Sequence, residues 1–170
     1  ILNKTIMGNL LKKTLINFLK IDNNKNNIIY ARNCQLKEIK GDELKIFLEE
    51  NHIWWYVPSS IWIGLYKDNE LKGVMTFKKA GADKWQRKNI IELSRLCFLK
   101  DIKIVWWTER MFSYFIKNYW SMLKNKTLIT FSDKLYFTGN IYKKLGFSLV
   151  KETDPNYYYV DPKKLEKKHR

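Results

Sequence analysis

The sequence predicts one mixed α+β domain in which a twisted, mostly antiparallel sheet is flanked by helices. Three patterns lead to this prediction: a hairpin turn at Asp68-Asn69 between two strand-like runs, a long amphipathic helix after the strand-like run 90–98, and a short helix that Gly146 ends just before Phe147. The chain has 170 residues, of which 45% are hydrophobic. This amount of apolar side chain can bury one good core but hardly two.

The N-terminal segment is expected to lie outside that domain. Apolar residues recur at helical spacing over residues 9–19, and the Asn-rich run 22–27 then breaks the pattern. Because the chain begins at Ile1 rather than Met, we expect this segment to be the trailing end of a larger product. The expected divisions are an N-terminal helix and linker at 1–27, a domain at 28–162 and a basic tail at 163–170.

One helix and five short strands are expected in the first half of the domain. The helix begins at Asp42, a favoured N-cap residue, and extends through Asn51 with Leu44, Phe47 and Leu48 on one face. The strands are apolar or alternating runs between turn residues. They are expected at 28–32, 35–40, 61–66, 71–78 and 90–98, the first two either separate or joined as one bulged strand.

The strongest helix of the chain follows these strands. Its apolar residues repeat at helical spacing from Met111 to Leu123, and Thr108 is the expected N-cap. A helix with so wide an apolar face must lie on a sheet. The remaining elements are expected to be a strand at 127–132, the short helix that contains Tyr142, and a final pair of strands at 147–152 and 156–160.

The net charge indicates an anionic partner. Lys and Arg together number 32 and Asp and Glu 17, which gives +15 and a pI near 9.7. So large an excess creates a field that attracts polyanions, and DNA is the expected partner. The alternative is a lysine-rich composition from an AT-biased genome, in which the charges only solvate the surface. Both interpretations stay open, because no single basic run is a nucleic-acid motif.

Composition also argues against other classes of protein. No run of about 18 or more apolar residues is present, so no membrane span is expected, and the N-terminus lacks a signal-peptide pattern. We therefore expect a cytoplasmic protein, in the host cytoplasm if the chain is phage-encoded. Cys34 and Cys97 lie far apart without companions at metal-ligand spacing. They are expected to be buried, reduced side chains, and no metal is expected.

The segment 137–147 carries the most specific pattern. It contains Tyr142, Leu145, Gly146 and Phe147 in the spacing Tyr-x-x-Leu-Gly-Phe. This pattern resembles a motif near the C-terminus of the GNAT superfamily of N-acetyltransferases. The resemblance implies a GNAT-like fold in which the Tyr142 hydroxyl protonates the departing thiolate of coenzyme A. The alternative is a tyrosine whose ring only packs on the sheet.

The same resemblance implies a site for acetyl-CoA or another acyl-CoA. In the family, the strand that here ends at Phe98 splays from its neighbour, and a Gly-rich turn then leads into the long helix, whose free N–H groups receive the pyrophosphate. In this chain the corresponding residues are Trp106, Trp107, Thr108, Glu109 and Arg110. Tryptophans replace the expected glycines and Glu109 adds a negative charge, while Arg110 and Lys103 are expected to pair with phosphate.

Two carboxylates are candidates for the general base. Glu92, on the strand expected at 90–98, and Asp133, after the strand expected at 127–132, lie nearest the expected site. Either would need a raised pKa to accept an ammonium proton near neutrality. The alternative for both is an ordinary ion pair at the surface. Arg95 is expected to be a buried charge that pairs with Glu92 or Asp133. His52, at the end of the first helix, is a third candidate base.

A second resemblance covers residues 28–160. Short motifs in order, from Tyr30-Ala31-Arg32 to Ser132-Asp133, resemble the GNAT-like domain of phage proteins that are homing-endonuclease-like and carry this domain behind a nuclease domain. In those relatives glycines stand where Trp55, Trp106 and Trp107 stand here. The resemblance implies a DNA-associated setting in a phage or mobile element.

Two functions are therefore expected from the sequence. The first is transfer of an acyl group from acyl-CoA to an amine, on nucleic acid or on a protein. The second is an inactive, DNA-binding accessory domain, which needs only a basic surface and aromatic groups that stack on bases. The residues expected to contact nucleic acid are Trp54, Trp55, Lys163, Lys164, Lys167 and Lys168. A nuclease is disfavoured, because the carboxylates form no evident metal-binding cluster.

Overall fold

A five-stranded sheet forms the centre of the chain, with the strand order β2-β3-β4-β5-β7. The computed structural model describes residues 28–39, 41–54, 56–79, 89–99, 102–134, 136–153, 159–160 and 167–168. The helix expected at 9–19, the Asn-rich linker and most of the basic tail lie outside these residues. The strands are β2 Gln35–Glu38, β3 Ile61–Lys67, β4 Glu70–Lys79, β5 Ile90–Phe98 and β7 Thr127–Thr130.

Strand directions confirm the predicted α+β class. Neighbouring strands of this sheet are antiparallel, except that β5 and β7 are parallel. The hairpin between β3 and β4 turns at Asp68 and Asn69, whose φ angles are 52° and 63°. Positive φ at both central residues is what a tight hairpin turn with the right twist requires, and Asp and Asn tolerate it. The hairpin pattern in the sequence therefore identified the correct turn.

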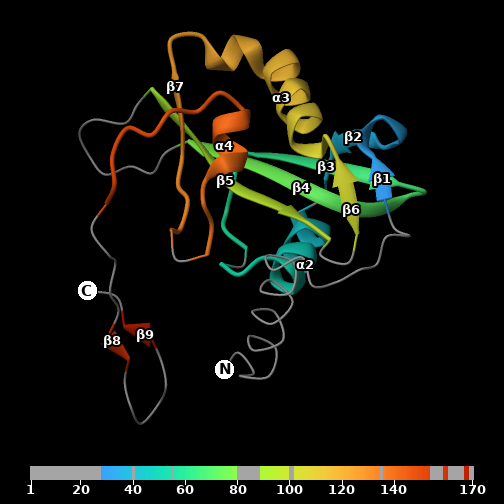
Figure 1. Cartoon of the computed structure of the whole chain (residues 1–170), viewed down its shortest axis with the longest axis horizontal. Coiled ribbons are helices and arrows are strands. Elements are labelled where there is room, and N and C mark those ends of the chain that lie inside the picture. Colours follow the sequence, from blue (N-terminus) through green and yellow to red (C-terminus); the bar gives the residue numbers. More distant parts are fainter. Residues whose placement is uncertain are drawn as a thin grey trace.

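The two longer helices lie on opposite sides of the sheet (Figure 1). The helix α2, Gly41–Asn51, buries its predicted apolar face against Val74 and Cys97 on one side of the sheet. The helix α3, Trp107–Leu123, covers the other side, where Phe115 stacks on Phe77 with 3.5 Å between ring centroids. None of the helices in the described ranges is long and apolar enough to cross a membrane.

A second, two-stranded sheet was not predicted. The strand β1, Ile28–Tyr30, pairs in parallel with β6, Lys103–Val105, a segment in which no strand was expected. The expected strand at 28–32 is shorter than predicted, because a 3-10 helix, Ala31–Asn33, follows β1. This small sheet fixes the chain immediately before α3, so it determines where that helix begins.

The C-terminal elements agree with the prediction only in part. The short helix α4, Asn140–Lys144, has left-handed glycines on both sides, Gly139 at φ 73° and Gly146 at φ 90°. The strand predicted at 147–152 is wrong, since these residues belong to no strand and Val150 is 94% exposed. Within the described chain no neighbouring strand pairs with this segment, so its apolar pattern has no sheet to join. The strand β8, Tyr159–Val160, pairs instead with β9, Lys167–Lys168.

Candidate active site

The strands β5 and β7 pair for only half the length of β5 and then separate. Their register begins at Ile90↔Thr127 and ends at Leu93↔Thr130, whereas β5 continues to Phe98. We call the region beyond this last pair the splay. Among the described residues, the β7 side of the later part of β5 has no partner strand. The Ser94 carbonyl oxygen in this part of β5 accepts a hydrogen bond from the Arg95 guanidinium.

A β-bulge explains why the strands separate at this point. On the other side of β5, Thr76 pairs with Arg95 and Phe77 with Leu93, so Ser94 is the extra residue. A bulge bends its strand and increases the local twist. Because the bulge comes immediately after the last pair with β7, it turns β5 away from that neighbour and opens the splay.

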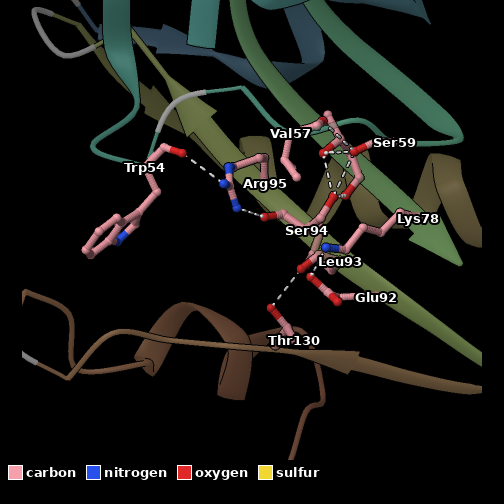
Figure 2. Close-up of polar contacts among 10 residues, drawn as sticks. Trp54, Val57, Ser59, Lys78, Glu92, Leu93, Ser94, Arg95 and Thr130 are labelled. Carbon is pink, nitrogen blue, oxygen red and sulfur yellow. Dashed lines mark hydrogen bonds and ion pairs between the residues drawn. The ribbon is translucent and has the colours of Figure 1, made fainter. Parts of the chain in front are cut away.

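Three hydroxyl groups hold the bulge in place. Ser94 Oγ lies 2.9 Å from Thr76 Oγ1 and 3.0 Å from Ser59 Oγ, and it also donates to the Thr76 carbonyl oxygen at 3.2 Å. Ser59 Oγ in turn donates to the Val57 carbonyl oxygen. Figure 2 shows this hydroxyl cluster joining β4, β5 and the loop before β3. The loop that follows α2 is thus attached to β5 at the bulge.

Arg95 makes a second connection between β5 and that loop. Its guanidinium donates to the carbonyl oxygens of Ser94 at 2.7 Å and Trp54 at 2.9 Å. Figure 2 shows the guanidinium between these carbonyls, with the Trp54 indole pointing away from it. Burial lowers the pKa of Arg95, and the nearby Glu92 carboxylate opposes that change. The side chain still carries its charge at neutral pH, because arginine starts from so high a value.

Tyr142 approaches the splay from α4. Its side chain packs against the core cluster to which α3 contributes. Its ring meets that of Phe147 edge-on, with 6.1 Å between the ring centroids. Burial raises the pKa of Tyr142 above its usual value, while a side-chain hydrogen bond with Thr130 and the charge of Arg95 act in the opposite direction. The phenol therefore keeps its proton at neutral pH. It lies close enough to the Arg95 guanidinium on β5 for that charge to act on it.

The candidate bases have defined surroundings. Glu92 forms an ion pair with Lys78, at 3.1 Å, and is paired with Ile129 in the register, so it lies just before the splay. Asp133 lies in the loop from β7 to α4, and its backbone carbonyl oxygen accepts the N–H of Phe137. His52 Nδ1 accepts the Trp54 N–H at 3.0 Å. Glu92 thus forms an ion pair, which was the alternative to a role as the base. Arg95 donates to backbone carbonyl oxygens and also interacts with the Glu92 charge.

The helix α3 begins two residues earlier than predicted. Its N-cap is Trp106, not Thr108, because the chain adopts a left-handed conformation at Trp106, with φ 58°. The Thr108 hydroxyl instead donates to the Glu109 carboxylate at 2.8 Å. The N–H of Arg110 is bonded to the Trp106 carbonyl oxygen. The first three N–H groups, those of residues 107–109, are the ones without an acceptor inside the helix.

The residues of this turn face different ways. Trp107 is only 6% exposed and its ring packs against Phe98, with 4.9 Å between centroids, so it belongs to the core. Trp106 is 64% exposed. The Arg110 guanidinium donates to the Cys34 carbonyl oxygen at 3.0 Å, which directs it toward the 3-10 helix. The left-handed conformation at Trp106 is one that glycine adopts without strain.

The residues proposed for nucleic-acid contact are only partly described. Trp54 is 38% exposed next to the splay. Lys167 and Lys168 form β9, of which only the backbone is described, and Trp55, Lys163 and Lys164 lie outside the described residues. Sequence reasoning missed Thr130 and the hydroxyl cluster. These hydroxyl groups come together at a β-bulge, and a bulge cannot be recognised from the sequence of one strand alone.

Comparison with known proteins supports the fold. A sequence model of the Mom protein family matches residues 33–170. A transcriptional regulator from Bacillus halodurans C-125 aligns with a TM-score of 0.55 at 12% identity and covers 73% of this chain and 99% of its own. No curated protein matches the sequence significantly.

Two of the similar solved structures are acetyltransferases. A GNAT-family acetyltransferase from Streptococcus pneumoniae TIGR4 has a TM-score of 0.50 and 10% identity, over 72% of this chain and 96% of that one. An aminoglycoside acetyltransferase from an uncultured soil metagenomic sample, solved with sisomicin, has a TM-score of 0.51 and 12% identity, over 76% and 97%. At these identities the likeness concerns the fold, which is that of the GNAT acetyltransferases.

Proposed function

The chain belongs to the Mom protein family, and we propose that it is an N-acyltransferase that moves an acyl group from acyl-CoA to an amine. The observation that carries this proposal is the splay itself. Beyond its last pair with β7, β5 runs from Arg95, whose charge acts on the phenol of Tyr142, to Phe98, whose ring packs on Trp107 in the first turn of α3. The GNAT acetyltransferases among the similar structures add support at the level of the fold.

The residues of the splay fit an acyl-CoA in part. An unpaired strand edge can bond the amide groups of an extended ligand, in the way that a sheet takes up an extra strand. The N–H groups of residues 107–109 and the exposed Lys103 can receive phosphate oxygens. Glu109 is the feature that opposes phosphate, because its carboxylate lies in the same first turn.

Acyl-CoA would supply a thioester, in which the carbonyl carbon is already activated toward amines. Tyr142 holds the proton that the departing thiolate sulfur takes up when the new C–N bond forms and the C–S bond breaks. Arg95 favours the phenolate that remains. The acceptor nitrogen loses two protons: one before it attacks, which converts the ammonium group to a neutral amine, and one after the C–N bond forms. Glu92, Asp133 or water would take these protons. Tyr142 regains its own proton from solvent.

The amine acceptor, in this proposal, is carried by or bound next to DNA. The support is the charge of +15, which gives the protein a general attraction for polyanions. Trp54 adds an exposed aromatic group beside the splay, on which a base could stack. A cytoplasmic location in a phage-infected or mobile-element-carrying cell would follow from the same setting.

The alternative function is a DNA-binding accessory domain without catalysis, as in the homing-endonuclease-like proteins that the sequence resembles. Two observations favour it. The carboxylate of Glu109 accepts the Thr108 hydroxyl in the turn where phosphate would bind. Trp106 places an indole where the related domains have glycine.

A direct assay separates the two functions. The full chain is incubated with acetyl-CoA and either duplex DNA or a polyamine, and release of free coenzyme A is measured together with the mass of the acceptor. Tyr142→Phe should lower the rate of acyl transfer by roughly 10²-fold while leaving the free energy of unfolding nearly unchanged. Full activity in this variant would show that Tyr142 is a packing residue. A wild-type protein that releases no coenzyme A with any acceptor would favour the accessory domain.

A further inference from the structure

Thr76 is the buried centre of the hydroxyl cluster that it forms with Ser59 and Ser94. Its Oγ1 lies 2.9 Å from Ser94 Oγ and 3.3 Å from Ser59 Oγ, and its backbone carbonyl oxygen accepts from Ser94 Oγ at 3.2 Å. Thr76 is 0% exposed, and its strand β4 pairs with a strand on either side, β3 and β5. The cluster is therefore anchored in a strand whose position is fixed from both sides.

The two serines of the cluster belong to different parts of the site. Ser94 is the extra residue of the bulge after which β5 and β7 separate. Ser59 lies in the loop between α2 and β3, and its Oγ donates to the Val57 carbonyl oxygen at 3.2 Å. The two serine hydroxyl oxygens lie 3.0 Å apart (Figure 2). Thr76 thus connects the bulge of β5 with this loop.

The apolar pattern of β5 requires a bulge but does not fix its shape. Leu93 packs in the core cluster on the α3 side of the sheet, whereas Cys97 packs in the cluster on the α2 side. Residues four apart in a regular strand face the same side, so an extra residue must lie between these two. The extra residue of a bulge is left out of the regular ladder, so its side chain has to hold it. Ser94 does so through its hydrogen bonds with Thr76 and Ser59.

We propose that Thr76 is a positioning residue for acyl-CoA, whose hydroxyl holds Ser94 in the bulge and thereby keeps β5 turned away from β7. The inference rests on the proposed acyltransferase function, because the splay is the site proposed for acyl-CoA. Thr76 acts through Ser94, since a side chain with no exposed surface does not touch a ligand. When the bulge loosens, only a fraction of the protein keeps an open splay, and the apparent affinity for acyl-CoA falls in proportion to that fraction.

Two substitutions isolate the Thr76 hydroxyl. Thr76→Val replaces it by a methyl group and keeps the shape of the side chain, whereas Thr76→Ser keeps the hydroxyl and removes the methyl group. In Thr76→Val the two serine hydroxyls still bond to each other and to the carbonyl oxygens of Val57 and of residue 76, so the variant should fold. The bonds from the Arg95 guanidinium to backbone carbonyl oxygens also stay in place.

The first test measures the bulge without any substrate. Amide hydrogen exchange is followed by mass spectrometry in the full chain, for peptides from the second half of β5 and from the loop before β3. Thr76→Val should speed exchange in these two segments about tenfold relative to the rest of the sheet, which is the scale expected for one lost buried hydrogen bond. Thr76→Ser should exchange like the wild type.

Val74→Ala is the matched control for a general loss of stability. Val74 lies two residues before Thr76 on the same face of β4 and is equally buried, but it packs in the apolar cluster on the α2 side. Its truncation leaves a cavity and should speed exchange throughout the sheet. If Thr76→Val gives the same uniform pattern, or no change, the hydroxyl does not hold the bulge and the proposal is overturned. An equal local effect in Thr76→Ser would assign the effect to the methyl groups and would also overturn it.

The second test measures acetyl-CoA binding by calorimetry, at a temperature where all four proteins are folded. Thr76→Val should bind acetyl-CoA about tenfold more weakly, whereas Thr76→Ser and Val74→Ala should bind it like the wild type. Equal affinity in all four proteins would overturn the positioning role. If the wild type binds no acetyl-CoA, the proposed function fails and the positioning role fails with it. The exchange experiment stays distinct from that failure, because a selective effect on the bulge requires no ligand.

Discussion

Glu109 is the residue with the most direct influence on anion binding at α3. Its carboxylate lies in the first helical turn, next to the N–H groups that have no acceptor inside the helix, and accepts the Thr108 hydroxyl at 2.8 Å. A negative charge at a helix N-terminus stabilises the helix. The same charge repels a phosphate that approaches those N–H groups, so Glu109 should weaken acyl-CoA binding.

We predict that Glu109→Gln binds acetyl-CoA about five- to tenfold more tightly, because the amide keeps an acceptor for Thr108 but removes the like charge. The dissociation constants of the two proteins would be compared by calorimetry at low salt. Asp42→Asn provides the control, since it makes the same chemical change in the first turn of α2. Equal affinity in Glu109→Gln and wild type would mean that phosphate does not bind at this turn.

At the residue scale, local motifs could be predicted from the sequence, whereas the tertiary partners of individual side chains could not. Tyr142 and the left-handed Gly146 follow from a short pattern within one helix and its end. The partners of Arg95 could not be predicted, because the Trp54 carbonyl comes from a loop 41 positions away in the sequence. The hydrogen bond from Thr130 to the Leu93 carbonyl oxygen is similar, because it depends on the register of β7 with β5, which a single strand does not specify.

At the scale of elements, the turn before α3 carries backbone strain. Trp106 adopts φ 58°, a conformation that costs an L-residue with a Cβ roughly 1–2 kcal/mol and glycine almost nothing. Its side chain is 64% exposed, so the indole recovers little of this cost by burial. The small sheet of β1 and β6 holds the chain in this conformation immediately before the helix.

We predict that Trp106→Gly raises the free energy of unfolding by about 1 kcal/mol, because it removes the strain at the N-cap of α3. Urea denaturation of the full chain would measure the change. Trp106→Ala is the matched control, since it removes the indole but keeps the Cβ, and it should gain little. If the alanine variant gains as much as the glycine variant, the indole and not the backbone is the source of strain.

Elements with a long hydrophobic pattern were predictable. The helices α2 and α3 and the hairpin of β3 and β4 lie close to their expected positions, because each buries a repeating apolar face. The strand β6 has three residues, too few for a period, and its partner lies more than seventy positions earlier. At 147–152 the alternating pattern was present but, in the described chain, no neighbouring strand pairs with it.

At the scale of the whole molecule, the charge of +15 is the dominant property. We predict that DNA binds with an affinity that falls steeply as salt increases, because each neutralised phosphate releases counterions. Fluorescence anisotropy at several salt concentrations would measure the slope. Little sequence preference is expected, since phosphate contacts carry no base information.

The basic tail provides a matched variant for that measurement. Replacing Lys163, Lys164, Lys167 and Lys168 by glutamine in the full chain should make the salt dependence shallower without changing the thermal stability of the core. Substituting Trp54 by alanine should instead weaken single-strand binding more than duplex binding, as expected for a lost stacking group. An affinity that does not respond to salt would return the lysines to a role as solvated surface.

Calorimetric titration of acetyl-CoA into the full chain tests most directly whether the splay between β5 and β7 binds acyl-CoA. We predict saturable binding of one acetyl-CoA per chain, unchanged in Tyr142→Phe and weakened by added salt, since the N–H groups of α3 and Lys103 would contact phosphate. Circular dichroism on the same samples would verify the fold. No detectable heat at millimolar acetyl-CoA with the fold intact would contradict the claim.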